Sequence, residues 1–316
     1  MTQKIALEEH FLAPGFDDYW NPTVADVPAA VRQRLHGALT DFGGQRLEIM
    51  DQAGIRWSVL SLSGPGVQVE PDTATAIRRA RQANDFLARE VSKQPTRFAG
   101  FAHLPMQDGK AAADELERCV RDLGFKGALI NGQTNGRHLD HPDLFPFWER
   151  VEALGSLVYL HPGDPVQPFA TLEGVYGLKR ATWEWTVETG SHALRIVFSG
   201  LFDRYPGAKL VLGHLGETLP YLLWRLDSRA KLYNVPLKRP PSAYIRENLL
   251  VTCSGMYSRE PLVCALEALG DSRVMFSADY PFESAIEAAR FMDDVAMDEG
   301  LRTKVAYGNA ATLLGL

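Results

Sequence analysis

The sequence predicts an α/β protein, a single (β/α)8 barrel of the TIM type. Strand-like apolar runs and helical runs alternate eight times through the 316 residues. The strand-like runs are short and continuously apolar, as are strands buried on both faces. Four of them end in His, Glu or Asp, and functional residues gather where barrel strands end. An open doubly wound sheet is the alternative, but no Gly-x-Gly-x-x-Gly follows the first run, which disfavours its dinucleotide-binding version.

Each expected strand is followed by an expected helix. The strands cover Lys4–Glu8, Trp57–Leu62, Phe98–Leu104, Lys126–Ile130, Ser156–Leu160, Lys209–Leu212, Leu249–Cys253 and Arg273–Ser277. The helices cover Gln45–Ala53, Asp72–Lys93, Lys110–Leu123, Pro142–Leu154, Glu184–Phe202, Glu217–Tyr233 and Glu260–Leu269, and two more complete the chain. Gly54, Gly124 and Gly155 directly follow three of these helices, as C-terminal caps commonly do.

One long insertion interrupts this alternation, between the first strand and the first helix. Residues 11–44 are rich in Pro, Gly and aromatic side chains. The segment is too long for a simple turn, so we expect a lid or a subunit contact. No linker composition appears elsewhere, which predicts one domain spanning residues 1–316.

The composition is that of an ordinary globular protein, with 46% hydrophobic and 23% charged residues. A net charge of −6 argues weakly against a nucleic-acid partner. The three cysteines have no metal-binding or redox spacing, which favours a reducing compartment. The N-terminus lacks a signal pattern, and no apolar run reaches the roughly 18 residues of a membrane helix. We therefore expect a cytoplasmic protein with no membrane partner.

Four residues at expected strand ends form a candidate metal site. Glu8 and His10 are two apart on an extended segment, so their side chains point to the same side. His161 ends a third strand-like run, and Asp279 follows the last. Two imidazoles and two carboxylates suit one Zn²⁺ or Mn²⁺, and the oxygen donors favour Mn²⁺. Taken singly, each has a plainer interpretation, such as a solvated turn, a histidine bonded to backbone, or a helix cap.

A second pair, His214 and Glu217, follows the strand Lys209–Leu212. A carboxylate three residues on can orient the imidazole and raise its basicity, although a capping role explains it equally well. Arg225 is suited to binding a carboxylate, or belongs to a surface charge network. Trp20 and Phe282 are candidates for an aromatic clamp on a flat ligand, although most aromatic residues are simply core.

These motifs resemble the amidohydrolase superfamily. The matching stretches are Glu8-x-His10, Tyr159-Leu160-His161-Pro162, Leu212-Gly213-His214-Leu215-Gly216-Glu217 and Phe276-Ser277-Ala278-Asp279-Tyr280-Pro281-Phe282-Glu283. Within that superfamily the chain resembles the metal-dependent, non-oxidative decarboxylases, whose members act on 2,6-dihydroxybenzoate, 2,3-dihydroxybenzoate or 5-carboxyvanillate. Hydrolytic members usually have His-x-His on the first strand and often a carboxylated Lys on the fourth. Glu8 replaces the first of these histidines, and no Lys ends the run Lys126–Ile130, so both departures favour the decarboxylase branch.

The resemblance implies a role for each matching position. Glu8, His10, His161 and Asp279 match the metal ligands, His214 matches the catalytic histidine, and Glu217 matches its partner. Asn131, Arg225 and Phe282 match positions in the substrate pocket. It also implies a homodimer or homotetramer and one divalent ion, with no organic cofactor.

The expected activity is loss of CO₂ from an ortho-hydroxy aromatic carboxylic acid. Asp279 is the candidate proton donor to the ring carbon, and His214 is the residue that polarises the phenol. A metal-dependent hydrolase, such as a lactonase or amidohydrolase, with Asp279 as general base is the alternative. A barrel that only binds a metal or a small molecule is a third interpretation, which the extra pair His214 and Glu217 disfavours.

Overall fold

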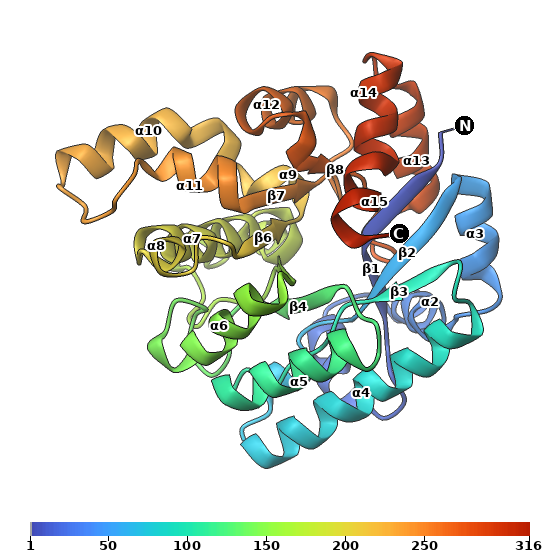
Figure 1. The fold of residues 1–316 in the computed structure, drawn as a ribbon. Helices are drawn as coiled ribbons and strands as arrows, with labels where there is room; N and C mark the ends of the chain where they lie inside the picture. Colours follow the sequence, from blue (N-terminus) through green and yellow to red (C-terminus); the bar gives the residue numbers. More distant parts are fainter. Residues whose placement is uncertain (1) are drawn as a thin grey trace.

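Eight parallel strands form a (β/α)8 barrel with helices around it (Figure 1). The computed structural model describes residues 2–316 and, at Tyr176, the backbone only. The strands are β1 Lys4–Phe11, β2 Ile55–Leu62, β3 Phe98–Gly100, β4 Gly127–Asn131, β5 Leu157–His161, β6 Lys209–Leu212, β7 Leu249–Thr252 and β8 Val274–Met275. Sequential neighbours pair in parallel from β1 to β3 and from β4 to β8. The predicted fold class is therefore confirmed.

Two short junctions close the cylinder. Between β3 and β4, Ala102 bridges Ala128, and the Ala102 amide donates to the carbonyl of Gly127 at 2.8 Å. Between β8 and β1, Glu9 bridges Tyr280, and the His10 amide donates to the Tyr280 carbonyl at 2.7 Å. The β8–β1 junction matters most, because metal-site candidates lie on both sides of it.

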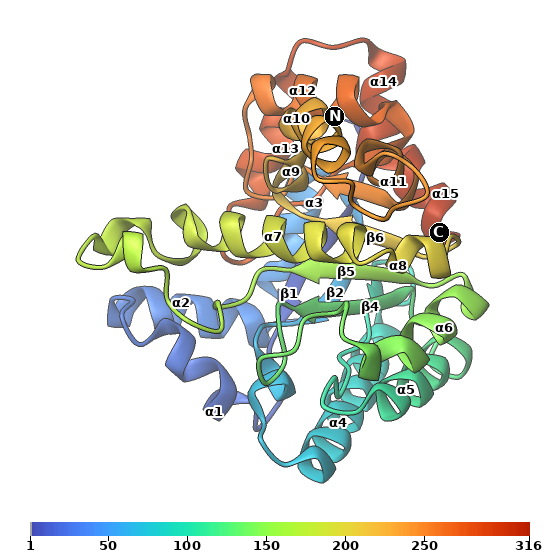
Figure 2. The ribbon, with the colours of Figure 1, turned by 90° about the vertical axis from the view of Figure 1, so that its left-hand side faces the viewer.

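The outer layer is helical, as Figures 1 and 2 show. Its helices of nine residues or more, apart from one in the 11–44 segment, are α3 Gln45–Ala53, α4 Thr73–Lys93, α5 Gly109–Arg121, α6 Phe145–Leu154, α7 Glu184–Phe198, α10 Leu219–Leu232, α12 Arg259–Leu269 and α13 Ala285–Asp294. The shorter helices are α8 Leu201–Arg204, α9 His214–Glu217, α11 Pro241–Asn248, α14 Glu299–Thr303 and α15 Asn309–Leu314. Gly54 and Gly155 end α3 and α6 with φ of 67° and 59°, in the left-handed region that glycine adopts readily.

Several expected elements have other bounds in the structure. The strand β1 continues to Phe11, and the helix expected over Glu217–Tyr233 is broken at Thr218, where φ is 67°. The run Glu184–Phe202 is broken at Gly200, where φ is 75°, so that α8 follows α7 as a separate turn. The third strand ends at Gly100 and the eighth at Met275, before their apolar runs end. Beyond these ends pairing continues only through isolated bridges, Ala102 with Ala128 and Glu9 with Tyr280, which apolar patterning cannot foresee.

The 11–44 segment contains α1 Asp17–Trp20, a 3-10 turn Asn21–Val24 and α2 Ala29–Thr40. Its aromatic residues Phe16 and Trp20 are each only 2% exposed, buried within the same chain. These two aromatic side chains therefore need no partner subunit to cover them. The aromatic content of the segment is thus no argument for the expected subunit contact. Arg180, in the loop between β5 and α7, donates to the Thr23 carbonyl, so this loop touches the 11–44 segment (Figure 2). The lid role stays a prediction.

Apolar side chains fill the barrel below the site. The interior cluster includes Ile5, Leu7, Val59, Phe101, Leu129, Tyr159, Val211, Leu250 and Met275. A larger cluster packs the strands against the surrounding helices. Within residues 2–316, no helix combines the length and apolar character needed to cross a bilayer.

Candidate metal centre and active site

An irregularity in β1 turns Glu8 and His10 into the barrel. Ile5 and Leu7 belong to the interior apolar cluster, so strict alternation would point Glu8 outward. The β1–β2 register shifts between Ala6 and Glu9, which inserts one extra residue into β1. The amides of Leu7 and Glu8 both donate to Ser277 Oγ, at 3.0 and 2.6 Å. Such bulges commonly redirect side chains beside active sites, as this one does.

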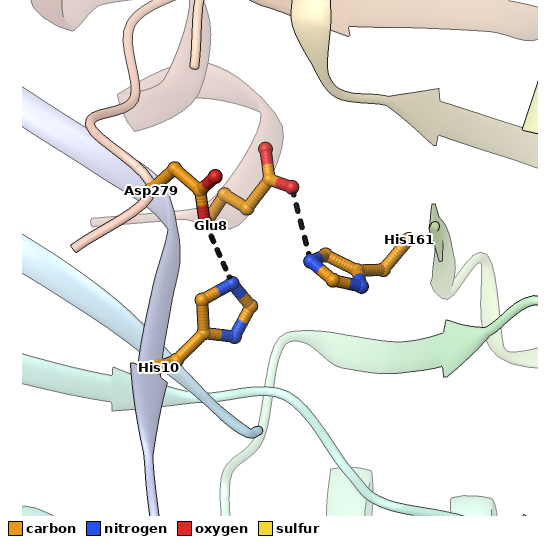
Figure 3. A group of neighbouring side chains, drawn as sticks. All are labelled: Glu8, His10, His161 and Asp279. Atoms are coloured by element: carbon orange, nitrogen blue, oxygen red, sulfur yellow. Dashed lines mark hydrogen bonds and ion pairs between the residues drawn. The ribbon is translucent and has the colours of Figure 1, made fainter. Parts of the chain in front are cut away.

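Four side chains converge at the carboxyl ends of the strands (Figure 3). Glu8, His10, His161 and Asp279 each offer one ligand-type atom, and these atoms lie within 4.8 Å of one another. His10 Nε2 is 3.1 Å from Asp279 Oδ1, and His161 Nε2 is 3.5 Å from Glu8 Oε1. The structure thus brings together the four residues that the sequence predicted as ligands.

Neighbouring groups hold each side chain so that a lone pair faces the centre. His161 Nδ1 lies 2.9 Å from the Pro162 carbonyl, so Nδ1 carries the proton and Nε2 keeps its lone pair. His10 Nδ1 is engaged by Ser61 Oγ at 3.2 Å. Glu8 Oε2 accepts from Tyr159 and Ser254, whereas its buried Oε1 has no hydrogen bond within the described chain. This donor set fits one divalent ion.

Burial and charge set the protonation states in this metal-free arrangement. Burial, with His10 nearby, lowers the pKa of His161 to about 3, which keeps the imidazole neutral as a ligand must be. Burial alone would raise the pKa of Asp279, but its contacts with His10 and His214 lower that pKa well below the usual range. Burial raises the pKa of Glu8, and His214 only partly offsets this effect.

His214 and Glu217 form the expected pair beside this set. His214 Nδ1 lies 2.6 Å from Glu217 Oε1, and its Nε2 lies 3.9 Å from Asp279 Oδ2. Burial alone would lower the pKa of His214, but the carboxylates of Glu217, Glu8 and Asp279 outweigh it and raise the pKa well above the ordinary value. These carboxylates therefore favour the imidazolium form of His214, whose Nε2 faces Asp279 Oδ2.

The turn that carries this pair is strained. His214, Leu215, Glu217 and Thr218 all have φ between 50° and 67°. Such conformations cost energy for residues with side chains, and they gather at functional sites. The preceding Gly213 is needed for space, because a Cβ there would lie 2.6 Å from Glu8 Oε2. The turn thus brings the histidine close to the candidate metal ligands.

The expected pocket residues are placed in different surroundings. The Phe282 ring is 5.5 Å from the His10 ring and 39% exposed, so it stands at the mouth of the site. Asn131 ends β4 beside His161. Its backbone N–H donates to Gln68 Oε1 at 2.6 Å, whereas its side-chain Oδ1 has no hydrogen bond within the described chain.

The structure places Trp20 on α1 and Arg225 on α10. Trp20 is buried within the 11–44 segment, where its ring lies 5.8 Å from that of His36. Arg225 is exposed on α10, at the periphery of the barrel (Figure 1). Within residues 2–316 neither forms a hydrogen bond or an ion pair with the four candidate ligands.

Sequence reasoning missed the residues that hold the ligands. Tyr159, Ser61 and Ser254 contact the outer atoms of Glu8 and His10. Glu9 Oε1 accepts from Ser277 Oγ at 3.1 Å and from the Ala278 amide at 2.9 Å, which joins β1 to the segment before Asp279. All of these lie at or near strand ends. The rule that polar residues at the ends of barrel strands are site candidates, which located the ligands, therefore also applies to them.

The fold and site are those of a barrel enzyme with a single metal ion, and comparison with known proteins identifies the family. A sequence profile described as amidohydrolase matches residues 35–316, and the chain belongs to this family. The chain is 44% identical over 330 residues to a γ-resorcylate decarboxylase of Rhodococcus jostii, covering 100% of this chain and 99% of the relative. The resemblance drawn from the motifs is confirmed.

Two solved structures are similar along the whole chain. A dihydroxybenzoic acid decarboxylase of Polaromonas sp. JS666, with bound manganese and 2-nitroresorcinol, has a TM-score of 0.94 and 43% identity, covering 100% of this chain and 98% of that one. A 2,6-dihydroxybenzoate decarboxylase in complex with 2,6-dihydroxybenzoate has a TM-score of 0.92 and 40% identity, covering 100% of both chains. Manganese in a neighbour of this similarity agrees with the single metal site formed here by His, Glu and Asp.

Proposed function

We propose that this protein is a metal-dependent decarboxylase that converts an ortho-hydroxybenzoate to the corresponding phenol and CO₂, with 2,6-dihydroxybenzoate as the first candidate substrate. The observation that carries the proposal is the placement of His214 Nε2, 3.9 Å from Asp279 Oδ2, beside four convergent ligands. Full-length similarity to γ-resorcylate decarboxylases supports it. A site that only stores metal needs no such additional acid.

The reaction requires a proton on the ring carbon that bears the carboxylate. Protonation there supplies the sink for the electron pair of the breaking C–C bond, and loss of CO₂ then restores aromaticity. A bound divalent ion would hold the carboxylate and ortho-oxygen together and lower the pKa of the phenol. Glu8, His10, His161 and Asp279 would hold that ion, and Phe282 at the mouth would contact the ring.

The protonation states assign the remaining steps. The pKa of Asp279 is lowered, so its carboxylate must receive a proton before it can donate one. The raised pKa of His214 favours its protonated form, and its Nε2 lies 3.9 Å from Asp279 Oδ2. We infer that His214 polarises the phenol oxygen and passes its proton to Asp279, which delivers it to carbon. Glu217 holds the imidazolium in place through Nδ1.

The hydrolase alternative uses the same family fold, but its support is weaker. It would make Asp279 a general base acting on water. Glu8 stands where hydrolytic members usually have the first histidine of His-x-His, and the similar full-length relatives are decarboxylases. Lactones and amides therefore serve as the discriminating substrates.

We expect turnover only when a hydroxyl group is adjacent to the carboxylate. The manganese-loaded protein is incubated with 2,6-dihydroxybenzoate, salicylate, 3-hydroxybenzoate and 4-hydroxybenzoate, and CO₂ release is measured. The ortho-hydroxy acids should react, whereas the meta and para isomers cannot form the chelate. Equal turnover of 4-hydroxybenzoate and 2,6-dihydroxybenzoate would refute the chelate, and preferential hydrolysis of a lactone would refute decarboxylation.

We further infer that the protein forms a homo-oligomer through α10 rather than through the 11–44 segment. Four large apolar side chains of α10 and its C-terminal end are well exposed: Tyr221 (82%), Trp224 (78%), Leu232 (58%) and Tyr233 (73%). Arg225 lies on the same helix, and acidic Glu260 and Glu267 line the adjacent groove, so a second copy would meet complementary charge. If Arg225 contacts a substrate, it would then do so in the substrate pocket of a neighbouring copy.

The state of assembly provides the check. Light scattering at micromolar concentration should give a dimer or tetramer, and Trp224→Glu should shift it towards the monomer because it places a charge on the apolar face. Trp183→Glu, at an aromatic residue that is 45% exposed and directly precedes α7, is the matched control. A monomeric native protein would contradict the inference.

A further inference from the structure

A second group of buried titratable residues lies behind the active site. His138, Glu188 and His192 bring their side-chain atoms within 4.8 Å of one another. Glu188 Oε1 is 3.8 Å from His192 Nδ1 and 3.9 Å from His138 Nε2. Glu188 and His192 lie on α7 and are 5% and 0% exposed, whereas the His138 side chain is 23% exposed. The proposed chemistry as described so far uses none of the three.

This group has the composition of a metal site, but the tautomer of His192 argues against one. His192 Nε2 accepts a hydrogen bond from the Leu139 amide at 2.8 Å, so Nε2 carries no proton. The proton of a neutral imidazole is then on Nδ1, and burial lowers the pKa of His192 well below its ordinary value, which keeps the ring neutral. Nδ1 therefore presents an N–H group towards Glu188 and has no lone pair for a cation.

Within residues 2–316, Glu188 pairs with no Lys or Arg, and only His138 and His192 approach it as potential cations. Thr189 Oγ1 lies 3.4 Å from its Oε2, whereas Oε1 has no hydrogen bond within residues 2–316. His138, His192, Glu217 and Asp164 are the titratable groups around it. Burial raises its pKa to about 8; the Thr189 hydrogen bond opposes this, and the carboxylates of Glu217 and Asp164 add to it. This raised pKa favours a protonated Glu188 at neutral pH, with a proton that it can release.

The group is next to the catalytic pair. A Cβ at Gly190 would lie 3.2 Å from the Glu217 carbonyl oxygen, so α7 packs directly on the turn that carries His214. A Cβ at Gly132, just beyond Asn131, would lie 3.6 Å from Glu188 Oε2. Glu217 Oε2, opposite the atom that binds His214, is buried and has no hydrogen bond in the described chain. Glu217, Glu188 and His192 thus each carry a buried polar atom without a hydrogen bond in the described chain, and His138 is partly exposed.

We propose that Glu188 is a proton-loading residue, which takes protons from solvent through His138 and supplies them to the His214–Glu217 pair. This inference rests on the proposed function. In decarboxylation the bond between ring and carboxylate breaks, its electron pair stays on the ring, and a new C–H bond takes one proton, so each turnover consumes one proton from solvent. A substrate that covers the mouth blocks direct access to His214, whereas Glu188 lies behind it. The separations of 3.8 and 3.9 Å suit bridging water rather than direct hydrogen bonds.

Glu188→Gln tests this role, because glutamine keeps the shape and cannot carry the proton. In dilute buffer we expect kcat to fall by about tenfold or more, less than the ~10²–10⁴-fold typical of a direct general acid. The fall is limited because solvent reaches His214, whose side chain is 21% exposed, when the mouth is open. Raising the concentration of imidazole buffer should restore kcat, while KM and metal content stay at wild-type values. Glu184→Gln, one turn earlier on α7, is the matched control and should show no buffer dependence.

An infrared measurement provides a readout that does not depend on activity. The wild-type protein, with or without metal, should show the C=O band of a protonated carboxyl group that titrates near pH 8, and Glu188→Gln should lack it. Wild-type kcat in Glu188→Gln at every buffer concentration would overturn the proposal, and so would a loss of activity that buffer does not restore. If Glu188→Gln does not fold, His138→Gln at the partly exposed end should show the same buffer dependence. A wild-type protein that releases no CO₂ from any hydroxybenzoate would refute the proposed function, whereas the infrared band still tests Glu188.

Discussion

Asp279→Asn should retain its metal ion and its substrate and lose decarboxylation by at least roughly 10²–10⁴-fold, the usual effect of removing a general acid. Asparagine tolerates the left-handed backbone of this position, where φ is 61°, so the turn after β8 should keep its path. Its amide oxygen can still face the ion, but the side chain cannot deliver a carboxylic proton. Glu8, His10 and His161 remain as ligands.

The measurement separates binding from chemistry. Metal content, substrate affinity and CO₂ release are determined for Asp279→Asn, His214→Asn and Glu217→Gln. His214→Asn should also abolish most turnover because it removes the imidazolium, and Glu217→Gln should have a milder effect because it only weakens the contact with Nδ1. Glu283→Gln, an exposed acid four residues beyond Asp279, is the control. If Asp279→Asn binds metal and substrate and releases CO₂ near the wild-type rate, the proton comes from another group.

The sequence predicted the barrel and the four-residue site because both depend on local patterns. Short apolar runs define the buried strands. In a barrel, a polar residue at the C-terminal end of such a run lies at the face where the active site forms. His161 at the end of β5 and the His214 turn after β6 were located in this way. The comparison with relatives confirms the family that these motifs indicated.

What the sequence did not predict depends on register and on contacts between distant segments. The extra residue in β1 appears only when β1 is paired with β2, and Ser277, which receives both bulge amides, is 269 positions from Glu8. Glu188 looked like an ordinary helix residue, since nothing local shows that α7 packs on the Glu217 turn. Length and aromatic composition likewise suggested a lid or a subunit contact for the 11–44 segment, whereas its Phe16 and Trp20 are buried within the same chain.

Glu8→Gln should weaken Mn²⁺ binding by more than about a hundredfold, which exceeds the ~10–100-fold typical of losing an outer contact of a ligand. Tyr159 donates to Glu8 Oε2, as does Ser254, so a glutamine should turn its oxygen to these donors. Its NH₂ group would then occupy the place of Oε1, facing His161 Nε2, and an amide nitrogen offers no lone pair to a cation. The site loses both a ligand and a negative charge.

The same change should leave the metal-free protein as stable as the wild type or more stable. In the metal-free site Glu8 is a buried acid with a raised pKa and an unpaired Oε1. A neutral amide removes that unfavourable charge and can donate to His161 Nε2, which lies 3.5 Å from the Oε1 position. Thermal unfolding with and without Mn²⁺, together with titration of the metal, measures both effects. Tyr159→Phe, which removes only an outer contact, should weaken metal binding less than Glu8→Gln does. Wild-type Mn²⁺ affinity in Glu8→Gln would show that Glu8 is not a ligand. A carboxylate that only packs beside the ion can be neutralised without loss of the ion.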